Sequence, residues 1–155
     1  MAETVAGVIL DILWKAGVRE TFGIPGVHNL AFWNALSASR PSIRSVRHEQ
    51  TTVYAADGLA RTTGGLGVAF TTTGPGAANT LGAFGEAAVS NSAVLVISSE
   101  APIKLRKPEL SRGLLHEMTD QSSLFSPLAK KDDAGKALAI SAQTGETAIL
   151  SLIHI

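Results

Sequence analysis

Helical and strand-like segments alternate along this chain of 155 residues, and this alternation limits the possible folds more than any other feature. Apolar residues recur with helical spacing in some segments, whereas others are short runs of Val, Ile and Phe bounded by Gly or Pro. Strands that alternate with helices are typical of a parallel sheet. The predicted helices cover 3–15, 30–39, 49–63 and part of 74–91, and the predicted strands cover 18–24, 43–48, 65–73 and 93–100.

The pattern predicts one α/β domain over residues 1–155, with an open parallel sheet and helices on both faces, a three-layer α/β/α arrangement. The run 93–100 is apolar almost throughout, as expected for a strand covered on both sides. A last helix over 136–143 and a last strand over 146–155 are also predicted. Because the chain ends on an apolar run, we expect this domain to be cut from a longer enzyme or to be the partner of one.

Charge and cysteine content exclude several classes of function. Lys plus Arg (13) equals Asp plus Glu (13), so no bulk field favours a nucleic acid or an anionic membrane. The absence of cysteine excludes disulfides, thiol catalysis and Cys-ligated metal. No apolar run approaches the ~20 residues that span a bilayer, and the N-terminus lacks the basic stretch of a signal peptide. The sequence predicts a cytoplasmic protein with no nucleic-acid or membrane partner.

Unusual residues fall in the loops that follow the first three predicted strands. These loops are GIPGVH (23–28), HEQ (48–50) and TTGPGAANT (72–80). Ligands of open parallel sheets bind beyond the carboxyl ends of the strands. We therefore expect the three loops to lie together at one edge.

Glu49 begins a predicted helix and shares one face with Val53, Ala56 and Ala60. One interpretation is an ordinary first-turn acid that interacts with the helix dipole, worth ~0.3–1 kcal/mol. The other is a partly desolvated carboxyl that holds or passes a proton at neutral pH. The helix alone leaves both interpretations open.

The glycine loop after the third strand also resembles a dinucleotide-binding turn. In the pattern G-x-G-x-x-G the third glycine is replaced by Asn79, and Glu100 lies about 20 residues further on, where a ribose-binding acid is expected. Against this alternative, Pro75 removes an amide from the anion-binding loop, and the strand is third in order rather than first.

Taken together, FGIPG, VRHEQTTVYAADGLARTTG, TTGPGAANT and VLVISSEAP, in this order and spacing, resemble the N-terminal pyrimidine-binding domain of thiamine-diphosphate enzymes. This family includes acetohydroxyacid synthase, pyruvate oxidase and benzoylformate decarboxylase. The resemblance covers about residues 3–131. It implies part of a 2-oxo acid decarboxylase or carboligase, acetolactate synthase-like, that acts on a small 2-oxo acid or aldehyde.

The resemblance implies roles for the loop residues. Glu49 matches the acid that hydrogen-bonds N1′ of the cofactor's aminopyrimidine and so promotes loss of the C2 proton from the thiazolium. Two loops match those that surround the thiazolium and the pyrimidine. Their expected cofactor-binding residues are Pro25, Gly26 and Val27 in the first, and Gly74, Pro75, Gly76 and Asn79 in the second.

Three histidines lie near these motifs. His28 matches a histidine that relays protons in benzaldehyde lyase-like members, with an ordinary loop or capping histidine as the alternative. His116 stands where the synthases have a substrate-facing glutamine. We expect it to be a substrate-side group, with Gln121 as a substitute amide. For His48 we expect a structural role through a backbone hydrogen bond.

The resemblance also implies a partner. In the family, Mg²⁺ and the diphosphate are held by a separate domain with a GDG motif, which these residues lack. That domain belongs to the same chain or to another subunit, so we expect a homo-oligomer and an isolated chain without activity. The remaining alternative is a non-catalytic dimerisation domain of the same fold.

Overall fold

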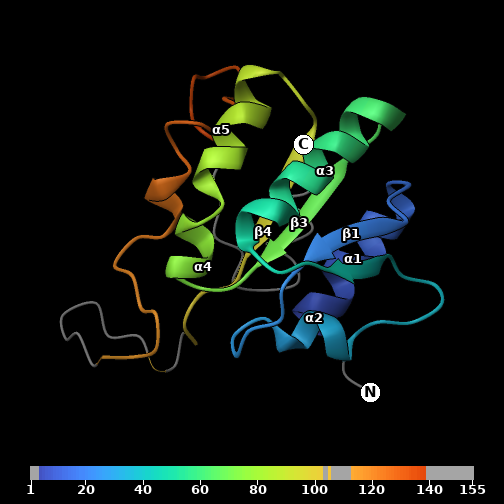
Figure 1. Cartoon of the computed structure of the whole chain (residues 1–155). Helices are drawn as coiled ribbons and strands as arrows, with labels where there is room; N and C mark the ends of the chain where they lie inside the picture. Colours follow the sequence, from blue (N-terminus) through green and yellow to red (C-terminus); the bar gives the residue numbers. More distant parts are fainter. Residues whose placement is uncertain (1–3, 103–104, 106–112, 139–155) are drawn as a thin grey trace.

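The computed structural model describes residues 4–102, 105 and 113–138, in which four parallel strands form one sheet in the order β2-β1-β3-β4 (Figure 1). The strands are β1 (Glu20–Gly23), β2 (Ser42–Ser45), β3 (Gly67–Thr71) and β4 (Val94–Ser98). The helices are α1 (Val5–Lys15), α2 (Leu30–Asn34), α3 (Glu49–Thr63), α4 (Pro75–Ala78) and α5 (Leu81–Val89), and a short 3₁₀ turn covers Ser122–Leu124.

Helices cover both faces of β3, whose residues are all buried. Val68 and Phe70 belong to one core cluster with residues of α1 and α2. Ala69, which points to the opposite face, packs with residues of α3 and α5. The predicted three-layer α/β/α arrangement is therefore confirmed, and Figure 1 shows α3 and α5 side by side on one face of the sheet.

The winding direction of the sheet reverses between β1 and β3. The chain passes from β1 outward to β2 and then returns to β3 on the other side of β1. In open parallel sheets the loops that diverge at such a point leave a ligand-binding crevice beyond the strand ends. The loops after β1 and β3 are thus the ones expected to form a site.

Helix α3 begins and ends where the sequence predicted. His48 is its N-cap, with Nδ1 accepting a hydrogen bond from the backbone N–H of Gln50 at 3.2 Å. The structural role expected for His48 is confirmed. The stripe predicted below Glu49 is also confirmed, because Val53, Ala56 and Ala60 are buried.

Other elements differ from the prediction. Helix α2 covers five residues instead of 30–39, and the predicted helix within 74–91 is divided into α4 and α5. Strand β4 is half-buried along its length, since the described residues place no further strand beside it. The last predicted helix beyond Leu138 and the last predicted strand lie outside the described residues.

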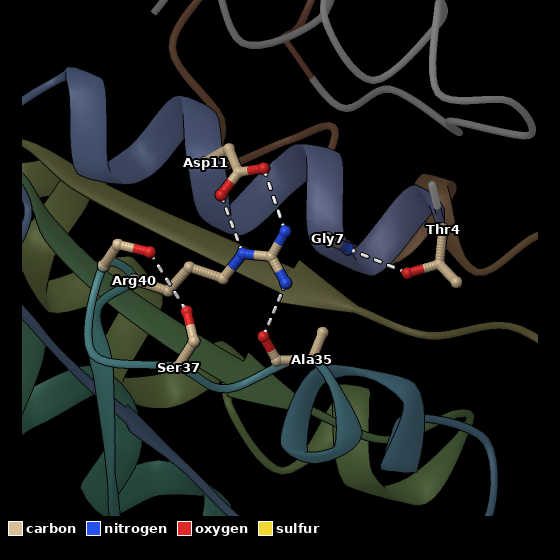
Figure 2. Close-up of polar contacts among 7 residues, drawn as sticks. Thr4, Gly7, Asp11, Ala35, Ser37 and Arg40 are labelled. Carbon is tan, nitrogen blue, oxygen red and sulfur yellow. Dashed lines mark hydrogen bonds and ion pairs between the residues drawn. The ribbon is translucent and has the colours of Figure 1, made fainter. Parts of the chain in front are cut away.

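A partly buried ion pair accompanies the early end of α2. Arg40 donates from Nε and Nη2 to the two carboxylate oxygens of Asp11 on α1, at 2.7 and 2.9 Å (Figure 2). Its Nη1 donates to the carbonyl oxygen of Ala35 at 2.7 Å, so this carbonyl at the end of α2 is satisfied without a further helical turn. The Arg40 guanidinium lowers the pKa of Asp11.

A second ion pair lies on α3, where Asp57 is buried at 6% exposure. Arg61 donates from Nε to one carboxylate oxygen at 2.9 Å, and its Nη2 lies 2.7 Å from the other. This hydrogen bonding lowers the pKa of Asp57 and raises that of Arg61. Because Nη2 of Arg61 also lies 3.8 Å from Oε1 of Glu86 on α5, the pair helps to fix α3 to this neighbour.

We expect Asp57→Asn to lower the free energy of unfolding at pH 7 by about 1–2 kcal/mol, because a buried charged pair loses one partner while Arg61 keeps contact with water. The folded pKa of Asp57 lies below its unfolded value, so its stabilisation is present above the unfolded pKa, about 4, and is lost as pH falls through the folded pKa. Urea denaturation between pH 7 and pH 3 measures both effects.

The matched control is Glu20→Gln, which breaks the exposed ion pair with Arg44. Exposed pairs contribute little, so we expect a change within about 0.5 kcal/mol. An Asp57→Asn variant with the acid dependence of the unmodified protein would contradict the assignment.

Candidate functional site

The loops after β1 and β3 pack closely through glycines. A Cβ atom on Gly26 would lie 2.7 Å from Oγ1 of Thr72, and one on Gly76 would lie 2.6 Å from Cγ2 of the same residue. Gly74 has φ +62° and ψ −112°, backbone angles that residues with side chains rarely adopt. A larger residue at Gly26 would push the two loops apart, and one at Gly76 would distort the loop after β3 itself.

The loop after β3 also reaches the start of α3. Nδ2 of Asn79 donates a hydrogen bond to Oε2 of Glu49 at 3.1 Å, and Glu49 is half-buried. Among the described residues, the other carboxylate oxygen, Oε1, forms no hydrogen bond. One oxygen of the acid is thus oriented by an amide, while the other is available to a ligand.

His28 lies in the loop after β1 and is anchored by the loop after β3. Its Nδ1 lies 2.9 Å from Oγ1 of Thr73, whose side chain is buried, and that hydroxyl lies 3.3 Å from Oγ of Ser99 at the end of β4. Within the described ranges, Nε2 of His28 has no hydrogen-bond partner. The imidazole ring is therefore held at Nδ1, and Nε2 is available to a ligand.

Asn29 fixes the turn that precedes His28. Its Oδ1 accepts from the backbone N–H of Gly26 at 2.7 Å, and its Nδ2 donates to the carbonyl oxygen of Ile24 at 3.0 Å. Asn29 is almost fully buried, whereas Val27 is 69% exposed. The turn thus holds Val27 outward, free to contact a molecule placed at this edge.

The structure brings most of the predicted site residues together. The loops of His28 and Glu49 are both tied to the loop 73–79, one through Thr73 and the other through Asn79. Pro75 begins α4 and is exposed. His116 is exposed with φ +59°, and its carbonyl oxygen lies against Gly74.

Thr73 was not identified from the sequence as part of this cluster, and Gln121 was given a different role. Thr73 follows a buried strand as the third of three threonines, and this position at the strand end is the signal that could have identified it. Gln121 was expected to be a substrate-side amide. Its side chain is 4% exposed and its amide is fully hydrogen-bonded within the protein, to Gly74, Ser98 and Ser99.

The described residues contain no group of three or more His, Asp or Glu side chains that could hold a metal ion. In the same part of the chain no helix is long and apolar enough to cross a membrane. The edge of the sheet thus carries one carboxylate, one imidazole and several glycines, and the two titratable groups can exchange protons with a ligand.

Comparison with known families gives one match over most of the chain. Residues 3–124 match the model described as the thiamine pyrophosphate enzyme, N-terminal TPP binding domain. The match includes Glu49 and both glycine loops.

Relatives with different reactions match about equally well. The chain is 40% identical over 141 residues to a probable 2-ketoarginine decarboxylase of Pseudomonas aeruginosa, covering 89% of this chain and 24% of the relative. It is 41% identical over 122 residues to 2-hydroxyacyl-CoA lyase 2 of Mus musculus, with 79% and 18% covered. It is 34% identical over 125 residues to acetolactate synthase of Bacillus subtilis, with 81% and 21% covered.

The fold also matches a solved structure, the thiamine diphosphate-dependent 4-hydroxybenzoylformate decarboxylase of Rhodococcus jostii. The TM-score is 0.72 at 22% identity, over 84% of this chain and 24% of that one. The chain thus spans no more than a quarter of the length of each of these relatives.

Proposed function

The chain belongs to the thiamine pyrophosphate enzymes, as their N-terminal TPP binding domain, and from this premise we propose that Glu49 is the acid that activates the cofactor in a 2-oxo acid decarboxylase or carboligase. The observation that supports this role is the hydrogen bond between Asn79 and Glu49, which orients one oxygen and leaves the other available. This domain occurs in enzymes that resemble acetolactate synthases and decarboxylases.

The residues present fit thiamine diphosphate. Gly26 and Gly76 pack against Thr72, and Gly74 packs against His116, so the backbone of these loops is held in one arrangement at the edge where the ligand would lie. A half-buried carboxyl beside them can share a proton with a ring nitrogen. When bound, the cofactor supplies a carbon nucleophile and an electron sink for cleavage beside a carbonyl carbon.

In this proposal the protein contributes orientation and proton transfer. Oε1 of Glu49 hydrogen-bonds the aminopyrimidine ring, and Asn79 keeps the carboxyl in the required orientation through Oε2. The loop residues Gly74, Pro75 and Gly76 line the pyrimidine. Because Glu49 lies on the first turn of α3 above a buried stripe, access of water to its inner side is limited.

In this proposal Pro25, Gly26 and Val27 of the loop after β1 would contact the thiazolium and the substrate when they are bound. Nε2 of His28 exchanges a proton with the substrate carbonyl or its product, since Thr73 holds the other ring nitrogen. His116 is a second substrate-side group, next to Gly74. Separate replacement of His28 and His116 by Ala tests these roles, and an unchanged kcat/KM in both variants would reject them.

The substrate is a small 2-oxo acid or aldehyde, and the complete site needs a second domain. That domain, from the same chain or another subunit of a homo-oligomer, holds Mg²⁺ and the diphosphate. This requirement agrees with the chain's length, since it spans only 18–24% of its curated relatives. The isolated chain, one domain, is therefore inactive in this proposal.

Calorimetric titration of the protein assembled with its diphosphate-binding domain tests the function directly. We expect binding of thiamine diphosphate in the presence of Mg²⁺ and no binding of NAD at the same concentration. Turnover of a 2-oxo acid should require the cofactor. Binding of NAD without thiamine diphosphate would support the dinucleotide alternative, and cofactor binding without any turnover would support a non-catalytic domain.

A further inference from the structure

The side-chain amide of Gln121 forms three hydrogen bonds, which use its oxygen and both of its N–H groups. Oε1 accepts from the backbone N–H of Gly74 at 2.6 Å. Nε2 donates to Oγ of Ser98 at 3.0 Å and to the carbonyl oxygen of Ser99 at 2.9 Å. With 4% exposure, this side chain is a buried cross-link between three segments that are distant in the sequence.

The cross-link is attached at the most constrained point of the glycine loop. Gly74 is buried, and its φ of +62° is accessible mainly to glycine. Without Gln121 its N–H would be a buried donor without a partner among the described residues, which is unfavourable. Gln121 therefore stabilises a backbone conformation that the loop does not favour by itself.

The same cross-link reaches both acid–base groups of the site. Ser98, which accepts from Gln121, donates to the carbonyl oxygen of Thr72 at 3.1 Å. The next residue of the loop, Thr73, anchors His28, and the helical turn that Gly74 begins ends at Asn79, the partner of Glu49. A shift of Gly74 would therefore displace both contacts.

The segment that carries Gln121, residues 113–121, also packs against the loop after β3. A Cβ on Gly74 would lie 2.4 Å from the carbonyl oxygen of His116, so this backbone rests directly on the glycine. Residues 116 and 121 thus contact Gly74 at two points. A displacement of the segment would therefore disturb both contacts with Gly74.

We propose that Gln121 is a positioning residue that holds the glycine loop in its cofactor-binding conformation and couples segment 113–121 to it. This inference rests on the proposed function, because the bound molecule is thiamine diphosphate. Gln121 does not touch substrate or cofactor in this role. It acts through Gly74, and through that residue on Asn79 and Thr73.

The test uses Gln121→Met in the protein assembled with its diphosphate-binding domain. Met has a similar length but cannot accept from Gly74 or donate to Ser98 and Ser99. We expect hydrogen exchange of the Gly74 amide to accelerate at least about tenfold relative to that of Phe70 in β3, and the Kd for thiamine diphosphate to rise about tenfold. The control is Ser122→Ala, which removes only a bond within the segment, to Asp120.

Unchanged Gly74 exchange and an unchanged Kd in Gln121→Met would overturn the proposal. If that variant does not fold, Gln121→Asn decides, because it keeps a polar amide but retracts it by one methylene from Gly74, Ser98 and Ser99. Faster Gly74 exchange with a several-fold higher Kd supports the proposal, and unmodified values reject it. A wild-type protein that binds no thiamine diphosphate would reject the proposed function, while Gly74 exchange would still show whether Gln121 holds the loop.

Discussion

Replacement of Glu49 by Gln should lower cofactor-dependent turnover of the assembled enzyme by about 100-fold or more, the scale of a positioned acid–base group. Gln preserves the shape of the side chain and can still hydrogen-bond Asn79, so the half-buried start of α3 keeps its packing. What it removes is a group that takes up and releases a proton. We therefore expect kcat to fall much more than the affinity for thiamine diphosphate, as measured by steady-state kinetics and calorimetry.

Two further variants make this result specific. Glu49→Asp keeps a carboxylate but retracts it by one methylene, so it should retain more activity than Glu49→Gln. Glu86→Gln removes an exposed carboxylate on α5, 59% accessible, that contacts Arg61 and Ser90, and should leave turnover unchanged. A Glu49→Gln enzyme with more than half of the original kcat would reject the assignment of Glu49.

Local signals in the sequence were sufficient to predict the elements that carry the site. The stripe through Val53 and Ala56 below Glu49 predicted α3, and the structure begins and ends this helix as predicted. The glycines and prolines between strands marked the loops correctly. Because all strands are parallel, these local assignments already implied that the loops meet at one edge.

Contacts between distant segments were not predictable in the same way. The hydrogen bond from Gly74 to Gln121 joins residues 47 positions apart, and no periodicity in the sequence encodes it. Gln121 was interpreted from the resemblance as a substitute for the substrate-facing glutamine of the synthases, whereas its side chain is buried within the protein. Likewise the early end of α2 is accompanied by an ion pair of Arg40 with α1, which propensity within 30–39 does not reveal.

The close approach of α3 to β3 depends on Gly67, the first residue of that strand. A Cβ on this residue would lie 2.0 Å from the carbonyl oxygen of Ala56 and 2.6 Å from its carbonyl carbon. These are backbone atoms of the middle of α3, so no side-chain rotation can relieve the overlap. The helix that presents Glu49 would have to move away from the sheet.

We therefore expect Gly67→Ala to destabilise the protein by about 3 kcal/mol or more, at the upper end of overpacking effects. The matched variant is Gly58→Ala on the same helix, where a Cβ would meet nothing within 4 Å. A glycine inside an exposed helical face costs helix stability, so this second change should stabilise by about 0.5–1 kcal/mol. Urea denaturation of both variants under identical conditions measures the difference. Equal effects of the two substitutions would mean that α3 does not rest on β3 through Gly67, and the position of Glu49 would then need another cause.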